Sequence, residues 1–222
     1  VIWATSMVAC GDADGAVTGN TRRFGASLEK IKQVVDVRDG EIMFGLNMVV
    51  HKGKTIFVGD TSVHEYPTSE QMAEIAISTA RVVRLFGFEP KVAFVSHSTF
   101  GQPLTSRTKH IRKAVDILKE QKVDFEFDGD MQPDVALDSE YKELYPFSNI
   151  VGKANILIMP GQHSAAISYK MMKTLGDTKV IGPLLIGLGL PIEIAPLRSS
   201  TSELINLASV AAYSADIIDY KK

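Results

Sequence analysis

IGPLLIGLGLPIEIAPLRSSTSELIN, residues 181–206, is the stretch that decides the fold. It opens with an apolar run broken by glycines, passes Pro191 into a short β-like segment, and reaches a polar turn before an apolar helical pattern over residues 204–218. Ser200 and Glu203 match a capping box, in which the hydroxyl accepts from an early helix N–H and the carboxylate reaches back. Such a helix start points free N–H groups at one spot and suits an anion, although the same residues also make an ordinary strand–turn–helix junction.

Strand and helix patterns alternate along the rest of the chain. A second capping box, Thr68 with Gln71, opens a helical pattern that ends at Phe86. Alternation of this kind is typical of βαβ units with a mostly parallel sheet covered on both faces, which predicts an α/β fold. The predicted helices are residues 2–10, 27–35, 69–86, 106–120 and 164–175, the predicted strands are 16–19, 41–50, 55–59, 91–96, 123–127 and 154–159, and residues 128–134 are predicted as a loop.

Composition limits the function classes. The 222 residues are enough for one large domain or two small lobes, and a formal net charge of -2 argues against a nucleic-acid binder. The single cysteine, Cys10, excludes a disulfide scaffold, favours the cytoplasm, and is expected to be a buried, inert thiol. The longest apolar run is too short and glycine-rich to span a bilayer, and no signal peptide is visible. A first residue Val1 in place of Met suggests a piece of a longer chain.

Four loops follow the carboxyl ends of predicted strands, where ligands bind in open α/β sheets: residues 96–101, 128–134, 160–164 and the turn within 181–206. The first, SHSTFG, either cradles a phosphate or forms a polar turn. The second is rich in aspartate and either holds a metal or, as we expect, orders the sheet edge. The five histidines lack metal-ligand spacing, and no G-x-G-x-x-G after a strand and no P-loop is present. We therefore expect no metal, nicotinamide or ATP site in this chain.

Seven segments, in one order over nearly the whole chain, resemble the phosphate acetyltransferase/butyryltransferase family. They are ADGAVTG (13–19), SEQMAEIAISTA (69–80), FEPKVAFVSHSTFG (88–101), FDGDMQPDVAL (127–137), KANILIMPGQHSAAISYK (153–170), IGPLLIGLGLP (181–191) and ELINLASVAA (203–212). Within the family, the forms TGNTRRF (18–24), GLNMVVHKGKTIFVGDTSVHEYPT (45–68) and HSTFG (97–101) are similar to the C-terminal domain of bacterial NADP-dependent malic enzymes, which is thought to sense acetyl-CoA.

The resemblance implies a three-layer α/β/α fold with two lobes and a cleft between them. Lobe one comprises residues 1–44 plus 186–222, and lobe two comprises residues 45–185. It also implies a homodimer or higher homo-oligomer, joined mainly through lobe two. Apolar residues beyond the needs of one helix face, such as Tyr169, Met171 and Met172, either meet a partner or fill the lobe's own core. NADP and a divalent metal are expected only in an upstream malic-enzyme body, with no cofactor in this domain.

Departures from the family pattern bear on the chemistry. Aligned without gaps on residues 203–206, the family's Ser-Arg pair falls on Pro196 and Leu197, while Glu203 takes the place of the acid. The arginine of the early helix aligns with Glu29. Stabilisation of a tetrahedral acyl intermediate needs such donors, so we expect no catalytic residue here. Three classes compete: a regulatory domain that binds acetyl-CoA, which we favour; an active acyltransferase in which Glu203 takes part and Arg198 compensates; and an oligomerisation module.

The effector site is expected in the cleft, because the phosphates of acetyl-CoA need cations and N–H donors. Its predicted residues are Ser98 and Thr99 from one lobe, with Arg198, Ser199, Ser200, Arg22 and Arg23 from the other. The alternative is that Arg22 and Arg23 are solvated surface charges and that Ser200 only caps its helix. We expect neither nucleic acid nor membrane as a partner.

Overall fold

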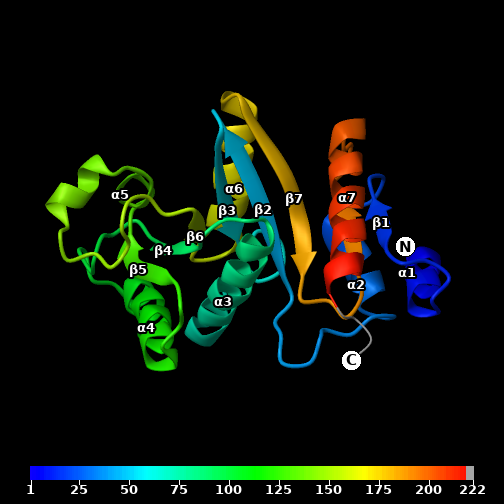
Figure 1. Cartoon of the computed structure of the whole chain (residues 1–222), viewed down its shortest axis with the longest axis horizontal. Coiled ribbons are helices and arrows are strands. Elements are labelled where there is room, and N and C mark those ends of the chain that lie inside the picture. Colours follow the sequence, from blue (N-terminus) through cyan, green and yellow to red (C-terminus); the bar gives the residue numbers. More distant parts are fainter. Residues whose placement is uncertain (219–222) are drawn as a thin grey trace. The chain divides into compact units, whose positions relative to one another are not determined.

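The computed structural model describes residues 1–218 and divides into two compact units (Figure 1). Unit 1 comprises Val1–Asn47 and the chain from Ile181 on, and unit 2 comprises Met48–Val180. Both divisions fall inside strands, β2 (Phe44–His51) and β7 (Thr178–Ile186). The predicted lobe limits, at Gly45 and Ile186, lie in the same two strands; these limits and the cleft stay predictions, and the last four residues of lobe one lie outside the described residues.

Most strands belong to one six-stranded sheet with the order β5-β4-β6-β3-β2-β7. Strand β3 (Lys54–Gly59) follows β2 through a tight turn, and both turn residues, Lys52 and Gly53, have positive φ, which is the conformation that a two-residue hairpin needs. Strands β4 (Lys91–Val95), β5 (Glu126–Met131) and β6 (Ile156–Ile158) pair in parallel, β4 with both others and β6 also with β3. Their carboxyl ends therefore share one edge of the sheet.

Helices cover both faces of this sheet, as the sequence predicts. Helices α3 (Ser69–Leu85) and α4 (Ser106–Gln121) contact each other and the strands. Both begin with complete capping boxes, Thr68 with Gln71 and Thr105 with Thr108. On the other face Val58, Ala93 and Leu157 form a core cluster with residues from α5 (Pro133–Leu137) and α6 (Gln162–Leu175). The expected α/β/α layering is confirmed for unit 2.

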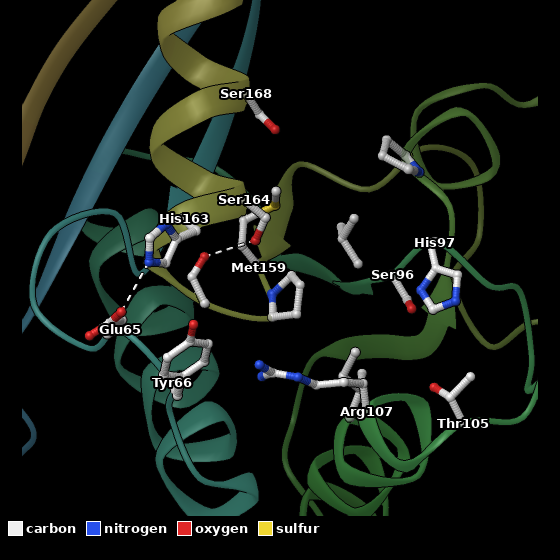
Figure 2. Close-up of a pocket in the computed structure, with 15 residues that line it drawn as sticks. Glu65, Tyr66, Ser96, His97, Thr105, Arg107, Met159, His163, Ser164 and Ser168 are labelled. Atoms are coloured by element: carbon white, nitrogen blue, oxygen red, sulfur yellow. Dashed lines mark hydrogen bonds and ion pairs between the residues drawn. The ribbon is translucent and has the colours of Figure 1, made fainter.

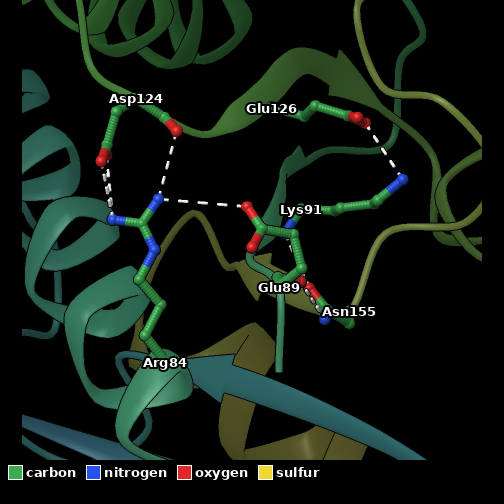
Figure 3. A network of polar contacts seen from close by, with 6 residues as sticks. All are labelled: Arg84, Glu89, Lys91, Asp124, Glu126 and Asn155. Carbon is green, nitrogen blue, oxygen red and sulfur yellow. Dashed lines mark hydrogen bonds and ion pairs between the residues drawn. The ribbon is translucent and has the colours of Figure 1, made fainter. Parts of the chain in front are cut away.

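The edge opposite these carboxyl ends is tied by polar side chains (Figure 3). The guanidinium of Arg84, at the end of α3, donates to both carboxylate oxygens of Asp124 at 3.0 Å. Asn155, just before β6, accepts from the backbone N–H of Lys91 at 2.8 Å and donates to the carbonyl of Glu89 at 2.8 Å. These bonds set the starting points of β4 and β6 side by side, which in turn aligns the loops at their far ends.

Unit 1 is built on a smaller parallel pair, β1 (Ala16–Gly19) with β8 (Ile192–Ala195). Helices α1 (Ile2–Ala9), α2 (Phe24–Ile31) and α7 (Thr201–Ile217) contact these strands (Figure 1). The capping box of Ser200 with Glu203 opens α7 as predicted. All four residues of β8 are buried, whereas all four residues of β1 are only partly buried.

Three local predictions are wrong. Residues 128–134 are not a loop: β5 runs through Met131, a turn of helix (α5) follows, and a short 3-10 helix covers Glu140–Leu144. The aspartates and Gly129 lower the β-propensity there, and the hydrogen bonds that the buried Asp128 and Asp130 accept offset it. Helix α2 begins at Phe24 and ends at Ile31, earlier than the periodicity indicates. Cys10 is exposed at the end of α1 rather than buried. Among residues 1–218, no helix is long and apolar enough to cross a membrane.

Candidate functional site

The first candidate region lies where β1 and β8 end in unit 1. The parallel register pairs Gly19 with Ala195, so the loops that follow the two strands start side by side. Asn20 then donates its N–H to the carbonyl of Ala195 at 2.9 Å and accepts at its own carbonyl from the N–H of Arg198 at 3.1 Å. Asn20 and Arg198 both have a φ of 61°, a left-handed conformation in which each backbone turns to meet the other. The two loops are thus joined by backbone bonds.

Three predicted site residues, Arg22, Arg23 and Arg198, emerge from these joined loops. All three are exposed, and in the part of the chain that the structure describes none of their guanidinium groups forms an ion pair. Arg23 is also the N-cap residue of α2, although its side chain makes no capping bond. The joined loops therefore carry three cations with free hydrogen-bonding capacity, which matches the needs of a phosphorylated ligand.

The serines of the same loop have partners within it. The Ser199 hydroxyl donates to the carbonyl of Pro196 at 2.9 Å. Ser200 Oγ accepts from the N–H of Glu203 at 3.3 Å, and the Glu203 carboxylate accepts from the N–H of Ser200 at 2.7 Å. These bonds shape the turn and the start of α7. The clearest contribution of the two serines is therefore to fix the loop that carries Arg198.

Ser98 and Thr99 belong to unit 2, in the loop after β4, and both are buried. The Ser98 hydroxyl donates to Asp130, whose other oxygen accepts from the N–H of Gly101 at 3.0 Å. Thr99 Oγ1 accepts from the N–H of Gln132 at 3.3 Å. Both hydroxyls are turned inward, and Asp130 is the residue that organises the loop. Sequence reasoning missed this role; the DGD at 128–130, directly behind a β-like run, was the available signal.

Unit 1 also contains a buried carboxyl, Glu193 in β8. The backbone N–H of Leu185 donates to its carboxyl at 2.9 Å. Desolvation by burial raises the pKa of Glu193 to about 8, and the Leu185 hydrogen bond only partly opposes that shift. Near neutral pH the group is therefore mostly protonated, and it titrates around pH 8.

The second candidate region is a cavity of about 470 Å³ within unit 2 (Figure 2). It opens at the carboxyl ends of β4 and β6, next to the predicted loops 96–101 and 160–164. Ser96 and His97, rather than Ser98 and Thr99, face this space. The other lining residues come from the end of β4, the loops after β3 and β6, the first two turns of α4 and α6 with their N-cap residues, and the start of α5: Glu65, Tyr66, Val95, Thr105, Arg107, Ile111, Pro133, Met159, Pro160, Gly161, His163, Ser164 and Ser168.

One wall of the cavity is held by a buried carboxylate, Asp60, at the end of β3. Its oxygens accept from the backbone N–H groups of Ser62, Val63 and His64 at 2.9, 3.2 and 2.7 Å. The His64 ring nitrogen Nδ1 also lies 2.7 Å from the Asp60 carboxylate. This nest of donors fixes the backbone that leads to Tyr66.

Within residues 1–218, no group of three or more His, Cys, Asp or Glu side chains converges in a way that would hold a metal ion. The three aspartates of residues 128–134 each accept from a backbone N–H: Asp128 from Asn149 at 2.7 Å, Asp130 from Gly101 at 3.0 Å and Asp134 from Val135 at 2.9 Å.

Comparison with known proteins places this arrangement among the phosphotransacetylases. A crystal structure of a phosphotransacetylase from Streptococcus pyogenes superposes with a TM-score of 0.90 at 28% identity, over 97% of this chain and 67% of that one. The EutD phosphotransacetylase from Staphylococcus aureus gives a TM-score of 0.84 at 27% identity, over 96% of this chain and 67% of that one. The fold class expected from the sequence is confirmed.

The family model described as phosphate acetyl/butaryl transferase matches residues 1–212, and the chain belongs to this family. It is 46% identical over 213 residues to an NADP-dependent malic enzyme of Rhizobium meliloti, covering 96% of this chain and 28% of that protein. It is 32% identical over 223 residues to a phosphate acetyltransferase of Clostridium acetobutylicum, covering 96% and 67%. The chain thus spans under a third of the malic enzymes that it matches, and the predicted resemblance to both groups is confirmed.

Departures from the family pattern are expected from the sequence at Pro196, Leu197 and Glu29, and the structure describes all three residues. Leu197 is exposed in the loop after β8, and Pro196 serves there only as a carbonyl acceptor for Ser199. Glu29 is exposed on α2. At these three positions the side chains supply neither a hydroxyl nor a guanidinium.

Proposed function

We propose that this domain binds an acyl-CoA, with acetyl-CoA as the effector, and does not transfer the acyl group. The observation that carries the proposal is the set of three arginines on the joined loops of unit 1, which form no ion pair with any other described residue. Guanidinium groups bind phosphate oxygens through short, charge-assisted bonds, and a CoA carries three phosphate groups. The absence of a hydroxyl and a guanidinium at Pro196 and Leu197 favours binding over catalysis.

The parent protein, on this proposal, is an NADP-dependent malic enzyme that converts malate to pyruvate by oxidative decarboxylation. Relatives at 46% and 35% identity are named NADP-dependent malic enzyme, and one at 38% is named probable NADP-dependent malic enzyme. This chain covers 28% to 29% of each. NADP and a divalent metal belong to the remaining part of such a protein. Acetyl-CoA bound to this domain regulates the malic-enzyme part, because it binds one of two conformational states of the whole chain more tightly than the other.

The test is a calorimetric titration with acetyl-CoA of the wild type, Arg198→Ala and Arg22→Ala. Loss of one charge-assisted bond, worth roughly 1.5–3 kcal/mol, weakens binding about 10- to 150-fold. Lys32→Ala is the matched control, because it removes the same charge from an exposed residue at the other end of α2. Unchanged affinity in both arginine variants, with folding intact, would place the effector elsewhere.

Acyl transfer is the second candidate, because phosphate acetyltransferases at 32% identity match 96% of this chain and Glu203 stands where the family has its acid. Transfer would move the acetyl group from the CoA sulfur to inorganic phosphate, giving acetyl phosphate and free CoA. The measurement is acetyl phosphate formation by the purified domain, with Glu203→Gln beside it. Product formation that the variant abolishes would favour transfer over sensing.

Homo-oligomerisation is the third part of the proposal. Only Ala165 of α6 is buried, whereas Ile167, Met171 and Leu175 are 58%, 54% and 82% exposed. A run of exposed apolar side chains on one helix favours a partner surface over a free one. Sedimentation of the purified domain at micromolar concentration should show a dimer or larger species, and a monomer would contradict this.

A further inference from the structure

The cavity in unit 2 has the size and position of a ligand site of its own. Its volume, about 470 Å³, falls within the range of roughly 300–1,000 Å³ that is usual for small-molecule sites. It lies at the carboxyl ends of two neighbouring parallel strands, the edge at which open α/β sheets bind ligands. The Asp60 and Asp130 bonds described above fix two of its bordering loops before any ligand arrives.

The floor of the cavity is apolar. Val95, Ile111 and Met159 line it and are themselves almost fully buried, at 3%, 2% and 6% exposure. Pro133 and Pro160 add further carbon surface. A ligand that fills this space must therefore present an apolar body, since a fully hydrated ion would lose water without replacement bonds.

The charged group that faces the cavity is Arg107, in the first turn of α4. Its guanidinium carbon lies 4.7 Å from the centre of the Tyr66 ring, and Figure 2 shows the group reaching over that ring. Within the described chain Arg107 forms no ion pair. Stacking occupies one face of the guanidinium and leaves its N–H edges for a ligand.

Among the described residues that line the cavity, Glu65 carries the one carboxylate, and it forms its ion pair with His163 rather than with Arg107. Glu65 Oε1 lies 3.0 Å from His163 Nε2, and Figure 2 shows this pair at the rim. The start of α6 lies in the same wall, and its N-cap, Gly161, offers no side-chain cap to the first N–H groups. Arg107 and this helix start together favour a negative charge.

We infer that this cavity binds a small organic anion, with its head group on Arg107 and its apolar body on Val95, Ile111 and Met159. The inference goes beyond the proposed acyl-CoA site, because every residue in it belongs to unit 2 and none of the arginines of unit 1 takes part. A carboxylate and a phosphate monoester share the required chemistry, and the experiment separates them.

The experiment is an NMR titration of the protein, without acyl-CoA, using four probes: benzoate, phenyl phosphate, benzyl alcohol and inorganic phosphate. The first two combine a ring with an anion, the third has only the ring, and the fourth only the anion. At least one aromatic anion should bind with a Kd on the order of millimolar or below, tenfold or more tightly than the last two probes. The tighter of the two anions identifies the preferred head group.

Arg107→Gln should weaken the binding of the tighter-binding anion about tenfold and leave the affinity for benzyl alcohol unchanged. Lys109→Gln is the matched control, since it removes the same charge from an exposed residue of the same helix that does not line the cavity. Ser168→Phe, on the accessible side of α6, should block all ring-bearing probes by filling the space. The inference would be overturned if neither aromatic anion binds, or if benzyl alcohol binds as tightly as the anions. It would also be overturned if the affinity of Arg107→Gln for the tighter-binding anion equals that of the wild type. None of these measurements uses acyl-CoA, so they test the inference about the cavity independently of the proposal for unit 1.

Discussion

Two buried carboxyl groups, one in each unit, differ in the number of hydrogen-bond donors around them. Asp60 in unit 2 is 2% exposed and accepts from three backbone N–H groups, with the His64 ring also in contact. Glu193 in unit 1 is 4% exposed and accepts from the backbone N–H of Leu185. Burial raises the pKa of Glu193 to about 8.

The difference shows that burial alone does not determine what a carboxyl does. Where several donors converge, the carboxylate becomes a fixed point around which a loop is built, and in unit 2 that loop borders the cavity. Where one donor is available, desolvation dominates and the group holds a proton at neutral pH. Unit 2 therefore contains a preformed wall of the cavity, whereas unit 1 contains a buried carboxyl group that titrates.

The largest expected effect comes from Glu193→Gln. In the unfolded chain the carboxyl loses its proton near its ordinary value of 4.5, but in the folded chain only near 8, so wild-type stability falls as pH rises between these values. A shift of this size corresponds to roughly 5 kcal/mol across the window. Glutamine does not titrate. The unfolding free energy of Glu193→Gln relative to that of the wild type, measured by urea unfolding, should therefore rise from pH 5 to pH 8.

The control for this experiment is Glu29→Gln, which removes an exposed carboxylate from the same unit. Its unfolding free energy should run parallel to that of the wild type over the same pH range. If the Glu193→Gln curve is also parallel to wild type, burial does not raise the pKa of Glu193 in the folded protein.

An intermediate effect is expected for Asp60→Asn. The amide keeps the shape but replaces one accepting oxygen by a donor that faces backbone N–H groups, so we expect a loss of about 2–4 kcal/mol in unfolding free energy. NMR shifts should change throughout residues 61–66, and the cavity probes should bind more weakly. Asp177→Asn, at an exposed position of the same unit, is the control. Wild-type stability in Asp60→Asn would mean that the loop does not depend on this carboxylate.

The smallest effect is expected for Ser200→Ala, which removes the N-cap of α7. Loss of such a cap costs about 1 kcal/mol, and Ser202→Ala, one residue inside the helix and without a capping bond, should cost less. Acetyl-CoA titration of the same variants separates the two roles considered for Ser200. A stability loss with unchanged affinity would leave it a capping residue only, and would remove it from the proposed site.

Local patterns in the sequence predicted the parts of this fold that depend on neighbouring residues. The capping boxes at Thr68 and Ser200 are confirmed because each needs only residues three apart. The alternation of strands and helices predicted the α/β class for the same reason, and the segment order predicted the family. The boundaries of α2 and β5 were wrong, because helix periodicity and β-propensity compete there with long-range burial.

The sequence by itself therefore determined the fold class, the family and the presence of arginines after β1 and β8. Only the tertiary structure decided which polar side chains are enclosed. Glu193, flanked by isoleucines in the pattern IEIA, would face solvent in a one-sided sheet, but all four residues of β8 are buried. Ser98 turns inward because Asp130, 32 residues away in sequence, lies beside it. Arg107 faces a cavity because Tyr66 lies beneath it. Such pairings depend on the register between strands that are distant in the chain, and no local periodicity encodes that register.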